Sequence, residues 1–305
     1  MRDTFVQTLL EEAQKDSNVV LITGDLGFGV LEKFESALPN QFINAGVAEQ
    51  AMLGLAAGMA STGKRVFVYS IGNFPTVRAL EQIRNDICYM NNPVVIVSVG
   101  AGYSYGSQGY THHALEDIAV MRALPGMNVV TPADPYETVE LTRYLVKNRK
   151  PGYLRLGRSG EKQINANPPK LSEGNLNPIV NGKDGSILFT GSIGVSVMEA
   201  RKHLLEEGID VGVYSVPFIS SLKHENLAEV LNLGPVLTVE EHSIRGGLGS
   251  SILELISANG LKGSVRIIGA SQKDLSQIGD QAYLREENGL GVSSIVKAFK
   301  SLLAD

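Results

Sequence analysis

Residues 93–99, Pro-Val-Val-Ile-Val-Ser-Val, decide the fold class of this 305-residue chain. The run is apolar without the alternation of a strand that has one face in water, so we expect helices on both faces. Similar apolar runs lie at residues 19–23, 65–69, 128–131 and 153–156, and helix-period segments separate them. Strands joined by crossover helices form a parallel sheet, so this half is predicted to be a doubly wound α/β domain.

The same alternation restarts after an interruption. Between residues 161 and 184 the periodicity fails, and Asn, Pro and Gly are frequent, a composition typical of a linker. Four further apolar runs alternate with helix-period segments; they lie at residues 186–190, 211–216, 236–239 and 265–268. We therefore predict an α/β protein with two doubly wound, mostly parallel-sheet domains, over residues 1–160 and 185–305, joined by a linker over 161–184.

Charge and cysteine content exclude several classes of function. Lys and Arg number 27 against 32 Asp and Glu, a net charge of −5 without a basic block, so nucleic-acid binding is not expected. The apolar runs are far shorter than the ~20 residues of a membrane-spanning helix. The single cysteine, Cys88, can form no internal disulfide and lies in a helical pattern. We expect it in the core of a cytoplasmic protein.

The glycine-rich segment after residue 99 superficially matches a dinucleotide fingerprint. Residues 100–106 read Gly-Ala-Gly-Tyr-Ser-Tyr-Gly, but a second polar, Gly-rich stretch follows before helical periodicity resumes near Ala114. The fingerprint must open a helix directly and needs an acidic residue about 20 positions further on, which is missing from the expected place. Nicotinamide binding is therefore a weak alternative.

Glu49 lies at the start of a helix that is apolar nearly all round, over residues 48–61. Burying a carboxylate is costly unless a partner compensates. Two interpretations remain open on composition: the carboxylate complements the helix dipole, or it is kept to hydrogen-bond a ligand nitrogen.

His112 and His113 end the Gly-rich loop. Adjacent residues point in different directions, so they form a poor metal pair and no metal ligands are expected in this chain. A histidine in a loop that follows a parallel strand is a candidate acid or base, because such sheets bind ligands outside their carboxyl ends.

Four motifs in the same order resemble the C-terminal part of transketolase, a thiamine-diphosphate enzyme. Residues 46–50, Gly-Val-Ala-Glu-Gln, resemble the segment whose glutamate contacts the aminopyrimidine of the cofactor. Residues 68–74, Val-Tyr-Ser-Ile-Gly-Asn-Phe, resemble the next strand and the aromatic residue that packs on that ring. Residues 109–112, Gly-Tyr-Thr-His, resemble the loop over the substrate channel, and residues 240–250 resemble the signature of the C-terminal domain.

The resemblance implies a role for each residue. Glu49 would be catalytic and would bind the cofactor, favouring the imino tautomer of the aminopyrimidine so that its exocyclic nitrogen can remove a proton from the thiazolium carbon. Phe74 and Tyr69 would bind the pyrimidine ring through apolar aromatic contact. His112 would be catalytic as well, hydrogen-bonding substrate oxygens or moving protons there.

The resemblance also implies substrate contacts. Arg2 and Arg158 fall where transketolases hold a sugar phosphate, and a guanidinium suits phosphate geometry. Asp25 resembles an aspartate beside the substrate channel. Gln108 stands where the family has Asp, and Gly100 stands where it has a basic or histidine phosphate contact. These two departures make the sugar and its phosphorylation open questions.

One family motif has no counterpart here. Transketolases carry Gly-Asp-Gly and a later Asn that hold a metal ion, and these 305 residues contain no such pair. We therefore expect the C-terminal subunit of a split transketolase, which transfers a two-carbon ketol unit from a ketose or its phosphate to an aldose or its phosphate. An N-terminal partner subunit would hold the diphosphate and Mg²⁺ or a similar ion, in a dimer of heterodimers.

Two alternatives remain from the sequence. The beta subunit of a 2-oxo-acid dehydrogenase is also a separate chain of the same superfamily, although the Gly-x-Thr-His loop favours transketolase. A non-catalytic interaction subunit could keep the fold without the chemistry, although Glu49, Phe74 and His112 together argue against it.

Overall fold

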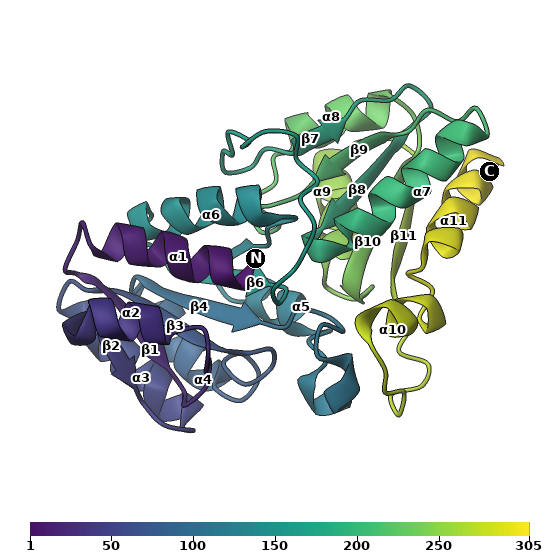
Figure 1. Ribbon diagram of the computed structural model, residues 1–305. Helices are drawn as coiled ribbons and strands as arrows, with labels where there is room; N and C mark the ends of the chain where they lie inside the picture. Colours follow the sequence, from purple (N-terminus) through teal and green to yellow (C-terminus); the bar gives the residue numbers. More distant parts are fainter. Residues whose placement is uncertain (305) are drawn as a thin grey trace.

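The computed structural model describes residues 1–304 and contains two α/β domains (Figure 1). The first domain has a six-stranded sheet in the order β2-β1-β3-β4-β6-β5, with every neighbouring pair parallel. Its strands are β1 Val19–Thr23, β2 Phe42–Asn44, β3 Arg65–Ile71, β4 Val94–Val99, β5 Asn128–Val130 and β6 Gly152–Leu156.

Helices cover both faces of this sheet, as the unbroken apolar strands predict. On one face, α1 packs against α6 with α2 beside it; these helices span Arg2–Ala13, Pro135–Lys147 and Glu32–Ala37. The other face carries α3 Glu49–Ser61, α4 Leu80–Gln82 with the π-helical Ile83–Tyr89, and α5 Asp117–Arg122. Cys88 is buried there, as expected.

The segment after β3 differs from the single helix expected over residues 76–91. A turn comes first, in which the Asn73 carbonyl accepts hydrogen bonds from the backbone N–H groups of Val77 and Arg78. Helical structure therefore starts late, at Leu80, and widens to a π-helix. Such widened turns are frequent at functional sites.

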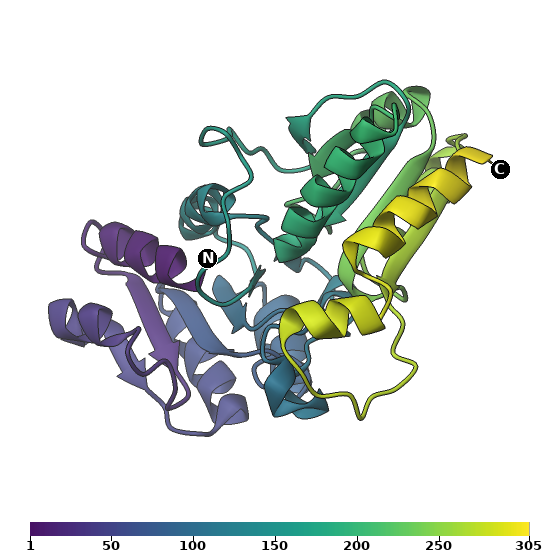
Figure 2. The ribbon, with the colours of Figure 1, turned by 45° about the vertical axis from the view of Figure 1, so that its right-hand side comes forward.

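The second domain has a five-stranded sheet in the order β11-β10-β8-β9-β7. All pairs are parallel except β7 with β9, so the prediction of two doubly wound, mostly parallel-sheet domains is confirmed. Helices α7 and α11 lie on one face, and α8 and α9 on the other (Figure 2). The elements are β7 Asn177–Val180, β8 Ser186–Thr190, β9 Gly212–Ser215, β10 Val236–Ser243, β11 Val265–Ala270, α7 Gly194–Glu206, α8 His224–Asn232, α9 Leu248–Asn259 and α11 Val292–Ala304.

Two elements have no counterpart in the sequence prediction. Strand β7 lies within residues 161–184, where an irregular linker was expected; it is an edge strand fixed by Asn177, whose side chain donates to the buried Glu137 at 2.7 Å. Helix α10, Gln281–Glu287, follows β11, and the Asp280 side chain caps it by accepting from the Tyr283 N–H at 2.9 Å.

Buried polar contacts join the two domains. Arg155 on β6 lies fully inside the protein, and its Nε donates to Asp117 Oδ2 at 2.7 Å. Its Nη2 also donates to the backbone oxygen of Glu241 on β10 at 3.0 Å. The end of β10 is thereby attached to the first domain. Within residues 1–304, none of the helices has both the length and the apolar character needed to cross a membrane.

Candidate functional site

Most of the predicted site residues come from five segments at one edge of the first sheet. Asp25 follows β1, Glu49 opens the helix after β2, Phe74 follows β3, the 100–112 loop follows β4, and Arg158 follows β6. The carboxyl ends of parallel strands meet at the same edge, where doubly wound sheets bind their ligands. Chain topology alone therefore brings these segments together.

Glu49 is paired with an arginine that the sequence analysis did not select. Its side chain is 3% exposed, and Oε2 accepts a hydrogen bond from Arg78 Nη1 at 2.8 Å. The Arg78 guanidinium carbon lies 4.5 Å from the centroid of the Phe74 ring. A flat, nitrogen-bearing group thus lies between a buried carboxylate and an aromatic face. The position of Arg78 four residues after Phe74 was the only signal for it in the sequence.

His112 lies beside the same aromatic ring. The centroids of the His112 and Phe74 rings are 5.2 Å apart in an edge-to-face arrangement. His112 Nδ1 is 3.0 Å from Thr111 Oγ1. Burial, and then the neighbouring His113, lowers the pKa of His112 from its ordinary value. The imidazole is therefore held toward its neutral form, which has one hydrogen-bond donor and one acceptor.

Asn73, next to Phe74, is a second residue that the sequence analysis missed. Its Nδ2 donates to the His113 carbonyl at 2.6 Å. Its Oδ1 is buried and has no hydrogen-bond partner among residues 1–304. Buried polar atoms are nearly always hydrogen-bonded, so this oxygen is an unused acceptor next to Phe74.

The structure brings Arg2 and Arg158 together. The Arg2 backbone N–H donates to the Arg158 carbonyl at 3.1 Å, joining the start of α1 to the end of β6. Arg158 is exposed, and its Nη1 approaches the Ser104 carbonyl at 3.4 Å. The Arg2 side chain pairs with Asp3 at 2.9 Å. The backbones of the two arginines thus meet at this edge, where the Arg158 side chain is exposed and the Arg2 guanidinium is held by Asp3.

Asp25 and Gln108 are exposed. Asp25 has a left-handed backbone, φ 56°, and exchanges two hydrogen bonds with Asn44, each of 3.0 Å. Asn44 also accepts from the Gly46 N–H at 3.0 Å and so fixes the turn that leads to Glu49. Gln108 lies on a short 3₁₀ turn of the loop after β4.

Tyr69 is not brought to the Glu49 and Phe74 side chains. It is buried in the core under α1 and stacks on Phe5, with ring centroids 6.3 Å apart. Neighbouring residues of a strand face opposite sides of the sheet, and Tyr69 lies on the α1 side whereas α3 is on the other. Burial raises the pKa of Tyr69, as expected for a core tyrosine.

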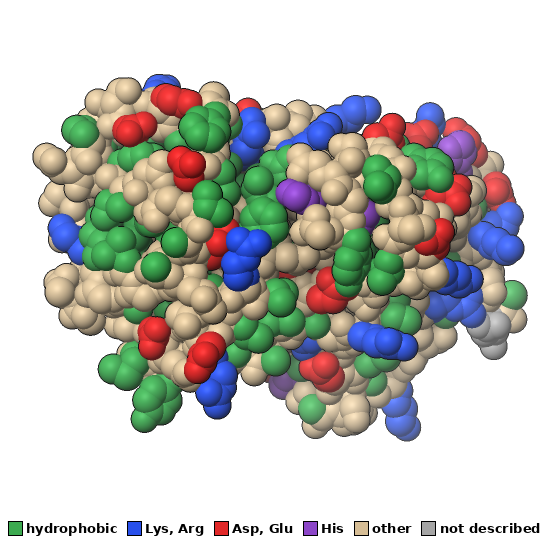
Figure 3. Space-filling model, turned by 90° about the horizontal axis from the view of Figure 1, so that it is seen from below, with side chains coloured by type: hydrophobic (Ala, Val, Ile, Leu, Met, Phe, Trp, Pro, Cys, Tyr) green, Lys and Arg blue, Asp and Glu red, His purple; other side chains and the backbone are tan. Residues whose placement is uncertain are grey.

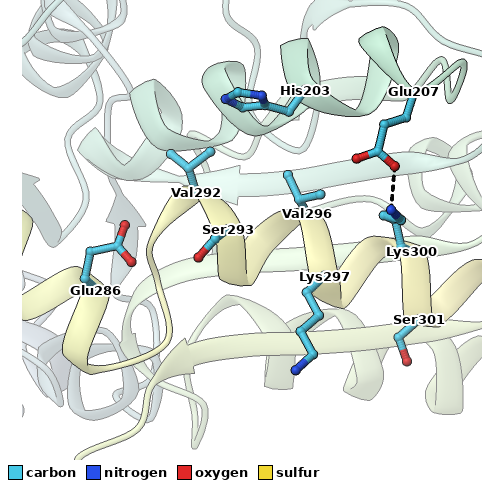
Figure 4. A pocket seen from close by; sticks show the side chains of 9 residues that line it. All are labelled: His203, Glu207, Glu286, Val292, Ser293, Val296, Lys297, Lys300 and Ser301. Atoms are coloured by element: carbon cyan, nitrogen blue, oxygen red, sulfur yellow. Dashed lines mark hydrogen bonds and ion pairs between the residues drawn. The ribbon is translucent and has the colours of Figure 1, made fainter.

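A separate groove of about 820 Å³ lies in the second domain, between α7 and α11 (Figure 4). His203 on α7 and Glu207 just after this helix border it on one side, and Val296 and Lys300 on α11 border it on the other. Lys300 pairs with Glu207 across one end. None of the predicted site residues lines this groove.

Glu49, Phe74, Arg78 and His112 form one cluster of side chains, in which a buried carboxylate, an aromatic face and an imidazole surround a flat guanidinium. The comparison with known families concerns the domains that carry this cluster. The model of the transketolase pyrimidine binding domain matches residues 1–161, and that of the transketolase C-terminal domain matches residues 174–295. The chain belongs to the transketolase family, an enzyme family of transferases, and the resemblance found in the sequence is confirmed.

Several relatives are separate subunits of similar length. The chain is 38% identical to one of the subunits of an apulose-4-phosphate transketolase from Phocaeicola vulgatus, over 90% of this chain and 88% of that protein. It is 32% identical to 6-deoxy-6-sulfo-D-fructose transketolase subunit SqwH of a Clostridium species, over 98% and 92%. Among solved structures, a split-gene transketolase, described as an inactive β4 tetramer, matches with a TM-score of 0.91 and 34% identity, over 99% of this chain and 98% of that chain.

The residues of this chain fit the pyrimidine end of thiamine diphosphate, the cofactor that the family implies. The Arg78 guanidinium is planar and carries N–H groups, and it already lies on Phe74 and bonds to Glu49. It occupies the contacts that an aminopyrimidine requires: an aromatic face and a carboxylate for a ring nitrogen. The unpartnered Asn73 oxygen offers one further acceptor.

Proposed function

We propose that this chain is the C-terminal subunit of a split, thiamine-diphosphate-dependent transketolase that transfers a two-carbon ketol unit from a ketose to an aldose. The observation that carries the proposal is the arrangement of Glu49, 3% exposed, and Phe74 around a flat nitrogen-bearing group. When bound, the cofactor supplies the nucleophilic carbon that carries the ketol unit between sugars.

The residues of this chain perform the steps around that carbon. With the cofactor bound, Glu49 would hold a proton at the pyrimidine ring nitrogen and so leave the exocyclic nitrogen able to act as a base. Phe74 supplies a flat apolar surface that orients the ring. His112, held toward its neutral form, accepts or donates a proton at the oxygens of the sugar.

The substrate carries an anionic group in this proposal. The names of the two relatives specify a sugar phosphate and a sulfonated sugar, both of which end in a tetrahedral anion. Arg2 and Arg158 meet at the edge of the site and suit either anion. The reducing cytoplasm is the proposed compartment, in keeping with the buried, unpaired Cys88.

Helix α3 begins at Glu49, and its outer face has the features of a surface that binds a partner subunit. Ala51, Gly54, Leu55 and Gly58 are exposed at spacings that place them on one side of the helix. A Cβ added at Gly54 or Gly58 would meet no atom within 4 Å, so this face is open for close approach by another backbone.

Apolar side chains surround the α3 face. Val47 before the helix, Tyr89 at the end of the π-helical segment and Met90 after it are among the most exposed large hydrophobic residues. Figure 3 looks at this underside of the molecule and shows apolar side chains gathered on it. Apolar patches next to a half-built site are typical of interaction surfaces. The proposed occupant is the N-terminal subunit with the diphosphate and Mg²⁺ or a similar ion, in a dimer of heterodimers.

The test compares the chain alone with the chain mixed with an N-terminal-type partner from a neighbouring reading frame. Ketol transfer from apulose 4-phosphate and from 6-deoxy-6-sulfofructose to a series of aldoses and aldose phosphates is measured with added thiamine diphosphate and Mg²⁺. We expect activity only in the mixture. Full activity of the chain by itself would refute the proposal that the enzyme is split between two subunits.

Glu49→Ala tests the site within that mixture. We expect turnover to fall at least a hundredfold, because the proton at the ring nitrogen loses its acceptor. Glu225→Ala is the matched control, since Glu225 also lies in the first turn of a helix but is exposed in the second domain. Wild-type turnover by the Glu49 variant would disprove the assignment.

A further inference from the structure

The carboxylate of Glu241 joins three segments at the boundary between the domains. It lies near the end of β10, in the stretch 240–250 that the sequence analysis treated only as a family signature. Its Oε1 accepts from the Tyr103 backbone N–H at 2.6 Å, in the loop after β4. On the other side it accepts from Gln281 Nε2 at 2.9 Å and from Arg285 Nε at 2.8 Å, both on α10.

This loop is the one that ends at His112. Its base is closed by two reciprocal hydrogen bonds of 3.0 Å between Gly102 and Ala114. The Tyr103 N–H that Glu241 holds is the next donor along the chain. Arg155 holds the same base from the first domain, since its Nη2 donates to the Ala114 carbonyl at 2.7 Å.

The fit of the loop against the second domain is close. Gly102 has φ +60°, and a Cβ there would lie 2.5 Å from the Glu241 side chain. A Cβ at Gly106 would lie 2.6 Å from the Gly279 carbonyl, in the segment before α10. Glycine is required at both positions because backbone approaches this close leave no room for a side chain.

We propose that Glu241 is a positioning residue for the transketolase reaction, acting through the Tyr103 N–H to hold the 102–112 loop and thereby His112 against Phe74. The effect on catalysis rests on the proposed function. The effect on the loop rests only on the contacts of Glu241 described above. The C-terminal domain thus controls a site whose reacting groups lie in the other domain.

The negative charge of Glu241 is what the arrangement requires. Its three partners are all donors, and hydrogen bonds to an ionised acceptor are about twice as strong as neutral ones. In Glu241→Gln, Arg285 loses its anion and the Tyr103 bond becomes a neutral one, while the side-chain shape is kept. The loop then opens more often.

Hydrogen exchange of the full chain without its partner is the first test, because it does not depend on the proposed activity. We expect Glu241→Gln to speed exchange of the amides of residues 102–112 at least tenfold and to leave β1 and β8 unchanged. Glu254→Gln is the matched control: Glu254 on α9 pairs with Arg122 on α5 at 2.6 Å, another ion pair between the two domains. Equal acceleration in both variants, or none in Glu241→Gln, would overturn the proposal.

Gly102→Ala perturbs the same contact from the loop side. Gly126→Ala is its control, because Gly126 also has a left-handed backbone, φ +74°, but a Cβ there would meet no atom within 4 Å. In the reconstituted enzyme we expect Glu241→Gln and Gly102→Ala to lower kcat/KM for apulose 4-phosphate at least tenfold, with the Kd of thiamine diphosphate changed less than twofold. A fall in cofactor affinity equal to the fall in kcat/KM would show general damage and refute positioning of the loop.

Discussion

Glu49 and Arg78 form an ion pair of 2.8 Å whose two members differ sharply in exposure: the glutamate side chain is 3% exposed and the arginine side chain 48%. The arginine can leave toward water at little cost, whereas the carboxylate stays buried and needs a replacement donor. Because the guanidinium also covers Phe74, any ring that binds there must first displace Arg78.

The first prediction follows from this competition. In the reconstituted enzyme, Arg78→Ala should bind thiamine diphosphate about fivefold more tightly, because displacing a half-exposed ion pair costs about 1 kcal/mol. Isothermal titration calorimetry measures the change. Arg84→Ala is the control, since Arg84 lies on the neighbouring π-helical turn and its Nη1 donates to the Asn85 side chain at 2.9 Å. Weaker binding by Arg78→Ala would mean that the arginine contacts the bound cofactor and does not compete with it.

The second prediction concerns the buried pair of Arg155 and Asp117. Arg155→Met should lower the free energy of unfolding by about 3–5 kcal/mol, because it leaves an uncompensated buried carboxylate. Asp117→Asn in the same chain should recover part of this loss. Urea unfolding provides the measurement, and Arg143→Met is the control, since the Arg143 side chain is 42% exposed and its ion pairs are 3.7 Å or longer. A loss equal to that of Arg143→Met would contradict the structural role of the pair.

Most of the fold could be predicted because its signals are local. Unbroken apolar runs and helix periodicity predict the first and last residues of β1, β8 and α9 as the structure has them. The elements that were missed depend on distant contacts. Helix α10 is short and highly charged, and it is held by Arg285 on Glu241, while β7 is an edge strand whose Asn177 is bound by Glu137.

The candidate site was harder to predict than the fold. Motif order placed Glu49, Phe74 and His112 at one sheet edge, because topology alone brings such segments together. Arg78 lies outside the motifs, and Asn73 lies inside one without a role of its own, since their contacts depend on how the turn after β3 folds. The side faced by Tyr69 could not be predicted, because a strand that is apolar on both faces has no alternation to orient it.

The third prediction tests the outer face of α3. Gly58→Gln should leave the isolated chain as stable as wild type or about 0.5–1 kcal/mol more stable, because Gln is the better helix former and the site is open. Its affinity for the N-terminal partner should fall at least tenfold, measured by analytical ultracentrifugation. Ser301→Gln on the exposed side of α11 should leave partner binding unchanged. Unaltered binding by Gly58→Gln would place the interface elsewhere.

The fourth prediction concerns His242 on β10. Burial lowers its pKa to about 4, outweighing the attraction of Asp117. Its contacts fit a neutral ring: Nδ1–H donates to the Ser243 carbonyl at 2.7 Å, and Nε2 accepts from the Ala119 N–H at 3.4 Å. As the pH falls below about 6.5, the unfolded chain takes up a proton that the folded chain refuses. The stability from this group is therefore complete above pH 6.5 and is lost as the pH falls through 4, by up to about 3 kcal/mol.

The pH profile of the wild type alone cannot reveal this loss, because neighbouring Glu240 acts in the opposite direction. Burial raises the pKa of Glu240 to about 7, so its contribution is complete below about pH 4.5 and is lost as the pH rises through 7. The difference between wild type and His242→Gln isolates the histidine, and it should shift by up to about 3 kcal/mol in favour of the variant between pH 6.5 and 4. His203→Gln, at a half-exposed histidine on α7, should run parallel to wild type. If the His242→Gln curve also runs parallel, the folded protein accepts the proton and the buried ring is not held neutral.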